Sequence, residues 1–241
     1  MKIAVVSDIH ANLHALEAVL ADIAKESPDE VWSLGDVVGY GAFPNRCASL
    51  LAAQTTVGLA GNHDLAATGR LSIGDFSADA AIAARWTLGE LDGNAREYLT
   101  SLPSELKLPG ADLFHGSPRD PVWDYVLSNE TAREALFLTT APIVLVGHTH
   151  VPLALAEDGK DLVGGIATDG AEVELDGRWL LNPGSVGQPR DGDPRASWLL
   201  LDLNAKRASF RRVSYDVAAA QAAIRDAALP DSLASRLSLG V

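Results

Sequence analysis

Histidine and carboxylate side chains recur in this 241-residue chain within five short motifs, four of which contain glycine. The motifs are Asp8-Ile9-His10, Gly35-Asp36, Gly61-Asn62-His63-Asp64, Phe114-His115-Gly116 and Gly147-His148-Thr149-His150. Imidazole nitrogens and carboxylate or amide oxygens are ligands for Mn²⁺, Fe and Zn²⁺, and they argue against copper or iron–sulfur chemistry. The candidate metal ligands are Asp8, His10, Asp36, Asn62, His115, His148 and His150. Seven ligands exceed what one tetrahedral ion needs, so the sequence predicts two ions.

Each motif follows a short apolar run that reads as a strand, at residues 3–7, 31–34, 55–59, 111–114 and 143–146. In α/β sheets, ligands bind at the carboxyl ends of strands, so the motifs are expected to meet at one edge. Positions i and i+2 of an extended segment face the same side, which pairs Asp8 with His10 and His148 with His150. Asp36 has no such neighbour, but its two oxygens can bridge two ions.

The apolar spacing predicts a layered α/β domain. Helices are expected at 13–23, 78–91, 95–102 and 216–228, and further strands at 153–156, 167–175, 179–181, 198–203 and 208–213. We expect residues 1–215 to form one domain, with the helix and tail of 216–241 packed on it or frayed from it. The last eleven residues, 231–241, read as a loose end.

Composition excludes several classes of protein. Hydrophobic residues make up 47% and charged residues 21%, as in ordinary folded chains, and no apolar run approaches the ~20 residues of a membrane span. The formal charge of −13 repels the phosphate backbone of long nucleic acids. The single cysteine, Cys47, excludes an internal disulfide and fits a reducing compartment. We therefore expect a soluble cytoplasmic protein that binds no membrane; the sequence carries no signal for its oligomeric state.

The five motifs, in this order, resemble those of the calcineurin-like metallophosphoesterase superfamily over residues 1 to about 190. The segments Gly39-Tyr40-Gly41, Arg85-Trp86-Thr87 and Asn182 to Arg190 are similar to its small bacterial and archaeal phosphodiesterases. The resemblance implies a four-layer α-β-β-α sandwich of two mixed sheets, with a dinuclear metal site at the carboxyl ends of strands. Ala11, where the subgroup usually has glycine, and Ala42-Phe43 depart from its pattern.

The resemblance also implies a role for each motif residue. One ion would be held by Asp8, His10, Asp36 and His150, and the other by Asp36, Asn62, His115 and His148. The ions would be Mn²⁺ first, with Fe, Zn²⁺ or Ni²⁺ as alternatives. A hydroxide bridging them would attack phosphorus in line. Protonated His63 would face the scissile phosphate, with Asp64 orienting it from behind.

The implied substrates are small phosphoesters, either phosphodiesters or nucleotide polyphosphates such as diadenosine tetraphosphate. A protein Ser/Thr phosphatase is the alternative within the enzyme class, although such enzymes usually need a longer chain. A non-catalytic scaffold is the alternative outside it, and the presence of all seven ligands and His63 disfavours it. The −13 charge and the lack of a basic stripe disfavour a nuclease.

Several aromatic and arginine side chains are candidates for contacts with the substrate. Tyr40 and Arg190 are candidate substrate-binding residues, and Tyr40, Trp123 and Tyr125 either stack on an aromatic group or simply pack. One of two arginines in a polar loop, Arg190 or Arg195, could bind a second phosphate through a pair of hydrogen bonds. The alternative for both arginines is a salt bridge to Asp191 or Asp193.

Overall fold

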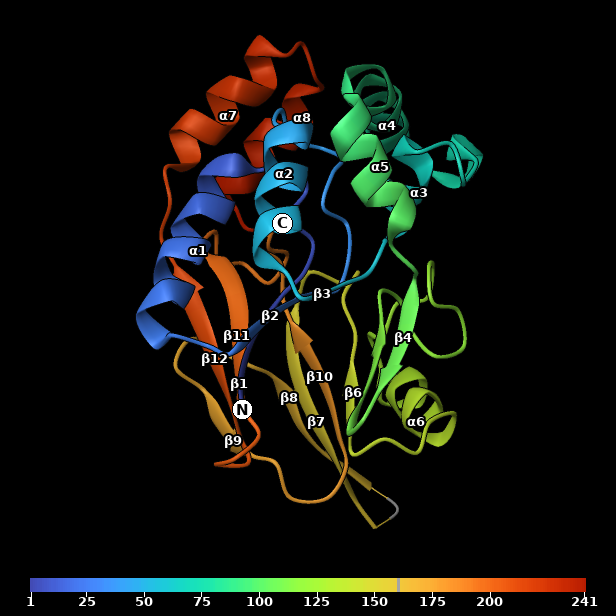
Figure 1. Ribbon diagram of the computed structural model, residues 1–241, viewed down its shortest axis with the longest axis vertical. Helices are drawn as coiled ribbons and strands as arrows, with labels where there is room; N and C mark the ends of the chain where they lie inside the picture. Colours follow the sequence, from blue (N-terminus) through green and yellow to red (C-terminus); the bar gives the residue numbers. More distant parts are fainter. Residues whose placement is uncertain (160) are drawn as a thin grey trace.

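Two six-stranded mixed sheets form the centre of the protein (Figure 1). The computed structural model describes residues 1–159 and 161–241. The first sheet has the order β3 (Val57–Gly58), β2 (Glu30–Ser33), β1 (Lys2–Val6), β11 (Ala196–Asp202), β12 (Arg207–Val213), β9 (Glu172–Glu174). The second has the order β4 (Glu105–Leu108), β5 (Ala111–Phe114), β6 (Ile143–Leu145), β10 (Trp179–Pro183), β7 (Pro152–Asp158), β8 (Asp161–Ile166).

The helices are α1 (Leu13–Glu26), α2 (Pro44–Gln54), α3 (Asn62–Ala67), α4 (Ala78–Glu90), α5 (Gly93–Ser101), α6 (Asn129–Phe137), α7 (Val217–Asp226) and α8 (Asp231–Ser235), with 3-10 turns η1 (Ile73–Asp75) and η2 (Arg236–Ser238). Helices α1, α2 and α5 pack on the outer face of the first sheet and α6 on that of the second, and the remaining helices lie at the upper end of the sandwich. The first helix begins where the Asn12 side chain accepts a hydrogen bond from the Ala15 amide, a standard N-cap. No helix in the described residues is long and apolar enough to cross a membrane.

Alternating side chains of the strands build three apolar layers. In β1, Ala4 and Val6 face α1 and α2, whereas Ile3 and Val5 face the second sheet. In β6, Ile143 and Leu145 point between the sheets, while Val144 packs on the opposite face with α6. This period of two, buried on both faces, is the pattern of central strands in a sandwich. The predicted four-layer α-β-β-α architecture is confirmed.

The strand predicted at 167–175 is wrong in its position. The Asp158-Gly159 turn pairs β8 with β7, so the hairpin uses residues 161–166 instead. A turn then follows, in which Gly170 has φ +75° and the Ala171 amide donates to the Thr168 carbonyl, and only 172–174 extend as β9. No prediction from the sequence covered strand β4 or helices α2, α3 and α6.

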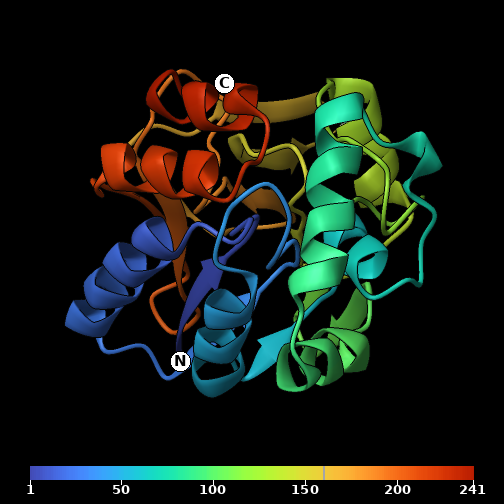
Figure 2. The same ribbon diagram turned by 90° about the horizontal axis from the view of Figure 1, so that it is seen from above.

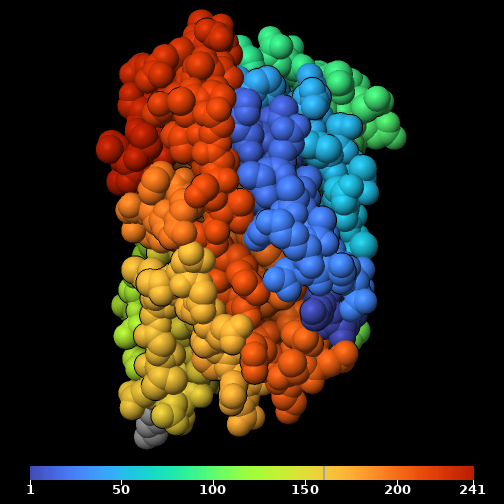
Figure 3. Space-filling model, turned by 90° about the vertical axis from the view of Figure 1, so that its left-hand side faces the viewer, coloured from blue at the N-terminus to red at the C-terminus, as the bar shows by residue number. Residues whose placement is uncertain are grey.

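The last eleven residues are not a loose end. Leu233, Ala234 and Leu237 are buried in a small core with Ile224 of α7 and Ala83 of α4. Gln221 of α7 donates to the Ala234 carbonyl and so fastens the two C-terminal helices together. Figures 2 and 3 show α7, in orange-red, beside α1 in blue, with the last eleven residues, in darker red, next to α7 and farther from α1. The C-terminal segment therefore forms a packed cap over the upper end of the sandwich.

Truncating Leu237 to alanine should destabilise this cap, because the side chain is 3% exposed and leaves a cavity. We expect the free energy of unfolding to fall by about 2–4 kcal/mol, measured by urea denaturation. The control is Leu239→Ala, at a side chain that is 61% exposed, which should change stability by less than about 0.5 kcal/mol. Equal, small effects at both positions would mean that the segment is not docked in solution.

Candidate metal centre

Five strand ends deliver the motif residues to one edge of the sandwich. Asp8 and His10 follow β1, Asp36 follows β2, and Asn62 begins α3 after β3. From the second sheet, His115 follows β5, and His148 and His150 follow β6. All seven candidate ligands are buried. Residues up to 142 positions apart in sequence (from Asp8 to His150) thus meet in one cluster.

The first group of donor atoms lies between β1 and the loop after β6. The Nε2 atoms of His10 and His150 are 3.0 Å apart, and Oδ1 of Asp8 is 3.9 Å from the former and 3.4 Å from the latter. Two atoms that each bind one ion at about 2.1 Å lie about 3 Å apart or slightly more. These three side chains are therefore spaced as ligands of a single cation.

The second group has the same spacing. Nε2 of His115 is 3.2 Å from Oδ1 of Asn62 and 3.2 Å from Nδ1 of His148. Asp36 belongs to both groups, since its Oδ2 atom is 3.6 Å from Nε2 of His10 and 3.4 Å from Nε2 of His115. The Oδ1 atom of Asp36 accepts a hydrogen bond from the His63 amide at 2.9 Å, so Oδ2 is the oxygen that faces the centre.

Backbone carbonyls fix which ring nitrogen faces the centre. Nδ1 of His10 faces the Val38 carbonyl at 3.3 Å, Nδ1 of His115 the Leu34 carbonyl at 2.9 Å, and Nδ1 of His150 the Gln188 carbonyl at 2.6 Å. A carbonyl only accepts, so each Nδ1 carries a proton and Nε2 is the nitrogen that each ring turns to the centre.

The cluster fits divalent cations. Lone pairs of His10 and His150 face each other at 3.0 Å, and Oδ1 of Asp8 and Oδ2 of Asp36 have no hydrogen-bond partner among the described residues. Buried carboxylates and lone pairs in this arrangement repel one another unless positive charge lies between them. Two cations, one in each group and both touching Asp36 Oδ2, would satisfy every one of these atoms.

The pKa values of the buried candidate ligands also indicate a site for positive charge. Burial raises the pKa of Asp8 to about 7 and lowers that of His148 to about 3, while the pKa values of His10 and His150 fall well below their usual range for the same reason. Burial alone would also lower the pKa of His115, but the charge and hydrogen bond of Asp36, the charge of Asp8 and the Leu34 carbonyl together outweigh it and raise that pKa to about 9. The other three imidazoles are neutral at pH 7, as metal ligands must be.

Backbone strain is concentrated in the same loops. Seven residues of these loops have φ between +48° and +62°, a left-handed conformation that costs non-glycine residues about 1–2 kcal/mol each. They are Asp8, His10, Ala11, Asp36, Tyr40, His148 and His150. Hydrogen bonds between loops hold this conformation: the amides of Asp8 and His10 donate to the carbonyls of Gly35 and Asp36 at 3.0 and 2.9 Å. At Ala11, φ is +52°, so the residue that departs from the family pattern occupies a glycine-type conformation. Strain of this kind is typical of functional sites.

His63 lies beside the centre and Asp64 supports it differently from the expectation. One ring nitrogen of His63 is within 4.8 Å of donor atoms of His10 and Asp36, and Nδ1 lies against Gly39. Burial lowers the pKa of His63 to about 4, so the ring is neutral at pH 7, in contrast to the protonated ring expected from the resemblance. Asp64 accepts hydrogen bonds from the amides of Val37, Val38 and Gly61, at 3.2, 3.0 and 3.0 Å. It positions the backbone of two ligand loops and not the His63 ring.

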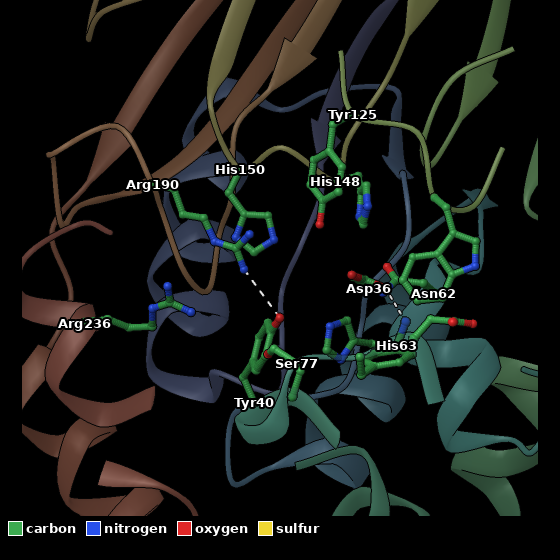
Figure 4. A pocket seen from close by; sticks show the side chains of 14 residues that line it. Asp36, Tyr40, Asn62, His63, Ser77, Tyr125, His148, His150, Arg190 and Arg236 are labelled. Carbon is green, nitrogen blue, oxygen red and sulfur yellow. Dashed lines mark hydrogen bonds between the residues drawn. The ribbon is translucent and has the colours of Figure 1, made fainter. Parts of the chain in front are cut away.

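A cavity of about 270 Å³ opens onto the centre (Figure 4). Tyr40, Trp123, Tyr125 and Arg190 all line it, as considered from the sequence. The Tyr125 ring stacks on His148 with centroids 3.9 Å apart, and Tyr40 lies 4.4 Å from the His63 ring. The cavity thus has metal ligands at its base and aromatic walls.

Of the two candidate arginines, only Arg190 reaches the cavity. Arg195 pairs instead with Asp193 at 2.6 Å and Asp169 at 2.8 Å, so the salt-bridge alternative holds for this residue. Five residues that the sequence did not single out also line the cavity: Asp75, Phe76, Ser77, Ala80 and Arg236. For Arg236 a signal existed, because Leu233 and Leu237, four residues apart after Pro230, are spaced as one face of a short helix.

Comparison with known proteins identifies the family. The sequence matches the calcineurin-like phosphoesterase superfamily domain over residues 1–206, so the chain belongs to this superfamily. It is 38% identical to an uncharacterized protein of Methanocaldococcus jannaschii, over 99% of this chain and 98% of that protein.

Two solved structures resemble the whole chain. A metallophosphoesterase from Sphaerobacter thermophilus has a TM-score of 0.92 and 43% sequence identity, covering 100% of this chain and 99% of its own. A hypothetical protein from Pyrococcus horikoshii shares the fold with a TM-score of 0.81 at 22% identity, covering 100% and 98%. The resemblance stated from the five motifs is confirmed at the level of family and fold.

Replacing Asp36 with asparagine tests whether one carboxylate serves both groups of donors. We expect the metal content of Mn²⁺-loaded, desalted protein, measured by inductively coupled plasma mass spectrometry, to fall from two ions per chain to one or none. Asp75→Asn is the matched control, because Asp75 lines the cavity but lies outside both donor groups; it should retain two ions. Two ions in Asp36→Asn would show that Asp36 is not shared.

Proposed function

We propose that this protein is a metal-dependent phosphoesterase that hydrolyses small phosphoesters. The observation that carries the proposal is the position of Asp36 Oδ2, which lies 3.6 and 3.4 Å from the inner nitrogens of two histidines in separate donor groups. A carboxylate oxygen shared in this way suits a pair of neighbouring divalent cations. The cavity above it gives a phosphate group direct access to both.

Each ion has four ligands in this proposal. The first would be held by Asp8, His10, Asp36 and His150, and the second by Asp36, Asn62, His115 and His148. Mn²⁺ suits the mixed nitrogen and oxygen donors, and Fe, Zn²⁺ or Ni²⁺ are the alternatives. When bound, such ions lower the pKa of a water and offset charge on the phosphoryl oxygens.

His63 is the residue that we propose contacts the reacting phosphate. It lines the cavity beside Asp36, and Gly39 packs against its Nδ1 edge: a Cβ on Gly39 would lie 2.4 Å from Nδ1. The ring is held on its other sides by Tyr40 and by Phe76, whose centroid is 4.9 Å away. A neutral ring so positioned donates from Nε2 to a phosphoryl or leaving-group oxygen, and Asp64 acts by fixing the loops that carry it.

The aromatic walls favour a phosphodiester or a nucleotide polyphosphate such as diadenosine tetraphosphate. Tyr40, Trp123 and Tyr125 offer ring faces to a nucleobase or another aryl group beside the phosphate, and Arg190 offers a cation. A cavity of about 270 Å³ suits a small molecule better than a phosphorylated protein surface, which disfavours a protein Ser/Thr phosphatase. A cytoplasmic location, the exclusion of long nucleic acids and membranes, and the division of the chain at residue 215 stay predictions.

The first experiment compares three substrates with Mn²⁺-loaded and chelator-treated protein. We expect metal-dependent cleavage of bis(p-nitrophenyl) phosphate and diadenosine tetraphosphate, with higher kcat/KM than for p-nitrophenyl phosphate. A preference for the monoester would contradict the proposed substrate class. No cleavage of any of the three by protein shown to hold two ions would favour a non-catalytic scaffold.

Replacing His63 with alanine separates catalysis from metal binding. Loss of a positioned hydrogen-bond donor should lower kcat by about 10²–10⁴-fold, measured with the best substrate of the panel. Metal content should remain at two ions per chain, because His63 is assigned to neither ion. His14→Ala, on α1 and with its ring against Phe43, is the control and should leave kcat unchanged. Loss of metal from His63→Ala would mean that the ring is a ligand.

A further inference from the structure

Two guanidinium groups from distant parts of the chain lie in the same cavity. Arg190 comes from the loop after β10, and Arg236 comes from η2 in the C-terminal cap. In Figure 4 both side chains lie on one side of the cavity, next to Tyr40 and across from Asn62. Neither residue belongs to the metal cluster.

The two arginines form no salt bridge with a carboxylate in the part of the chain that the structure describes. Their neighbours in the same region are paired: Arg195 with Asp193 and Asp169, and Arg212 with Asp191. The nearby Asp79 carboxylate instead accepts a hydrogen bond from Ser232. Nε of Arg190 is buried without a hydrogen-bond partner, although an arginine has five N–H groups to satisfy.

One glutamine holds both cations. Oε1 of Gln188 accepts from Nη2 of Arg190 at 2.8 Å and lies 3.5 Å from Nη1 of Arg236. The backbone carbonyl of the same residue accepts from Nδ1 of His150, which connects the arginines to the first donor group. One neutral oxygen cannot offset two positive charges, and the charge of each guanidinium disfavours the other. Burial and the neighbouring Arg190 accordingly lower the pKa of Arg236.

Packing of the surrounding chain holds the two arginines together despite the repulsion between their charges. The Gly192 amide, two residues after Arg190, donates to the Gly240 carbonyl at 2.9 Å. Gly240 fits so closely that a Cβ there would lie 2.8 Å from the Asp193 backbone. Leu237, the neighbour of Arg236, is anchored in the core of the C-terminal cap. The arrangement is therefore built by packing on both sides and is not an accident of two flexible surface chains.

Tyr40 lies between the arginines and the metal centre. Its ring centroid is 4.5 Å from that of His10, and its hydroxyl is 3.5 Å from Nη2 of Arg190. The arginines thus lie about one aromatic ring away from the first group of metal ligands, along the wall of the cavity. A substrate phosphate at the metals would have its neighbouring groups at this wall.

We propose that Arg190 and Arg236 together bind a second phosphate group of the substrate. The proposal rests on the proposed function for the position of the scissile phosphate. The ligand class is a phosphoester with a further phosphate close to the reacting one, as in nucleotide polyphosphates. Two planar guanidinium groups with free N–H donors match the oxygens of such an anion, which supplies the negative charge that this wall lacks.

Calorimetric titration of inorganic tripolyphosphate into chelator-treated, dialysed protein tests the anion site without the metals. Hydrogen bonds to charged groups predict that Arg236→Gln and Arg190→Gln each raise the dissociation constant by about 10-fold or more. Arg236→Lys should restore only part of the affinity, because lysine retains the charge but not the planar donors. Arg225→Gln, which removes an exposed arginine of the same segment, controls for net charge and should change little. Unchanged affinity in Arg236→Gln, with its thermal midpoint intact, would overturn the proposal.

Kinetics on the Mn²⁺-loaded protein separates the two proposals. We expect Arg236→Gln to lower kcat/KM for diadenosine tetraphosphate at least about 10-fold more than it lowers kcat/KM for bis(p-nitrophenyl) phosphate, which has no second phosphate. Equal losses for both substrates would overturn the second-phosphate site and leave the phosphoesterase in place. No turnover of either substrate by wild type, together with Arg236-dependent tripolyphosphate binding, would overturn the proposed function and leave the anion site.

Discussion

The structure depends on one electrostatic constraint: negative and lone-pair-bearing atoms are buried so close together that positive charge must accompany them. Asp36 Oδ2 is at the centre of this constraint, between the inner nitrogens of His10 and His115. In a low-dielectric interior such contacts are costly unless they are compensated. The two sheets, the loop hydrogen bonds and the carbonyls behind the rings of His10, His115 and His150 all hold these atoms in place against their repulsion.

The second constraint, at the cavity wall, has the opposite sign. Arg190 and Arg236 are held together with only the Gln188 oxygen between them, while surrounding arginines have carboxylate partners. The interior of the cavity is thus divided into a region that requires cations and a region that requires an anion. The proposed substrate, a metal-bound phosphoester with a second phosphate, would answer both requirements at once.

The sequence predicted the part of this arrangement that repeats locally. Apolar runs followed by a potential ligand appear five times, with glycine next to the ligand in four, so strand ends and ligands could be inferred from residues 1–190, whereas the sandwich was implied by the family resemblance. The C-terminal cap could be predicted only in part, because the spacing of Leu233 and Leu237 indicates a short helix but not its docking against α4 and α7. The place of Arg236 in the cavity follows only from that tertiary packing. The partners of Asp64 were missed for a similar reason, since they are backbone amides and not side chains.

The left-handed loops have a consequence for the energy landscape of the protein. Six candidate site residues and Ala11 share this unfavourable conformation, so the edge of the sandwich is locally frustrated while the cores beneath it are not. A ligand that makes favourable contacts with this strained geometry would offset its conformational cost. Cation binding is therefore expected to act as the last step of folding for the three loops that carry these residues, and metal supply would set how much of the chain population has an ordered site.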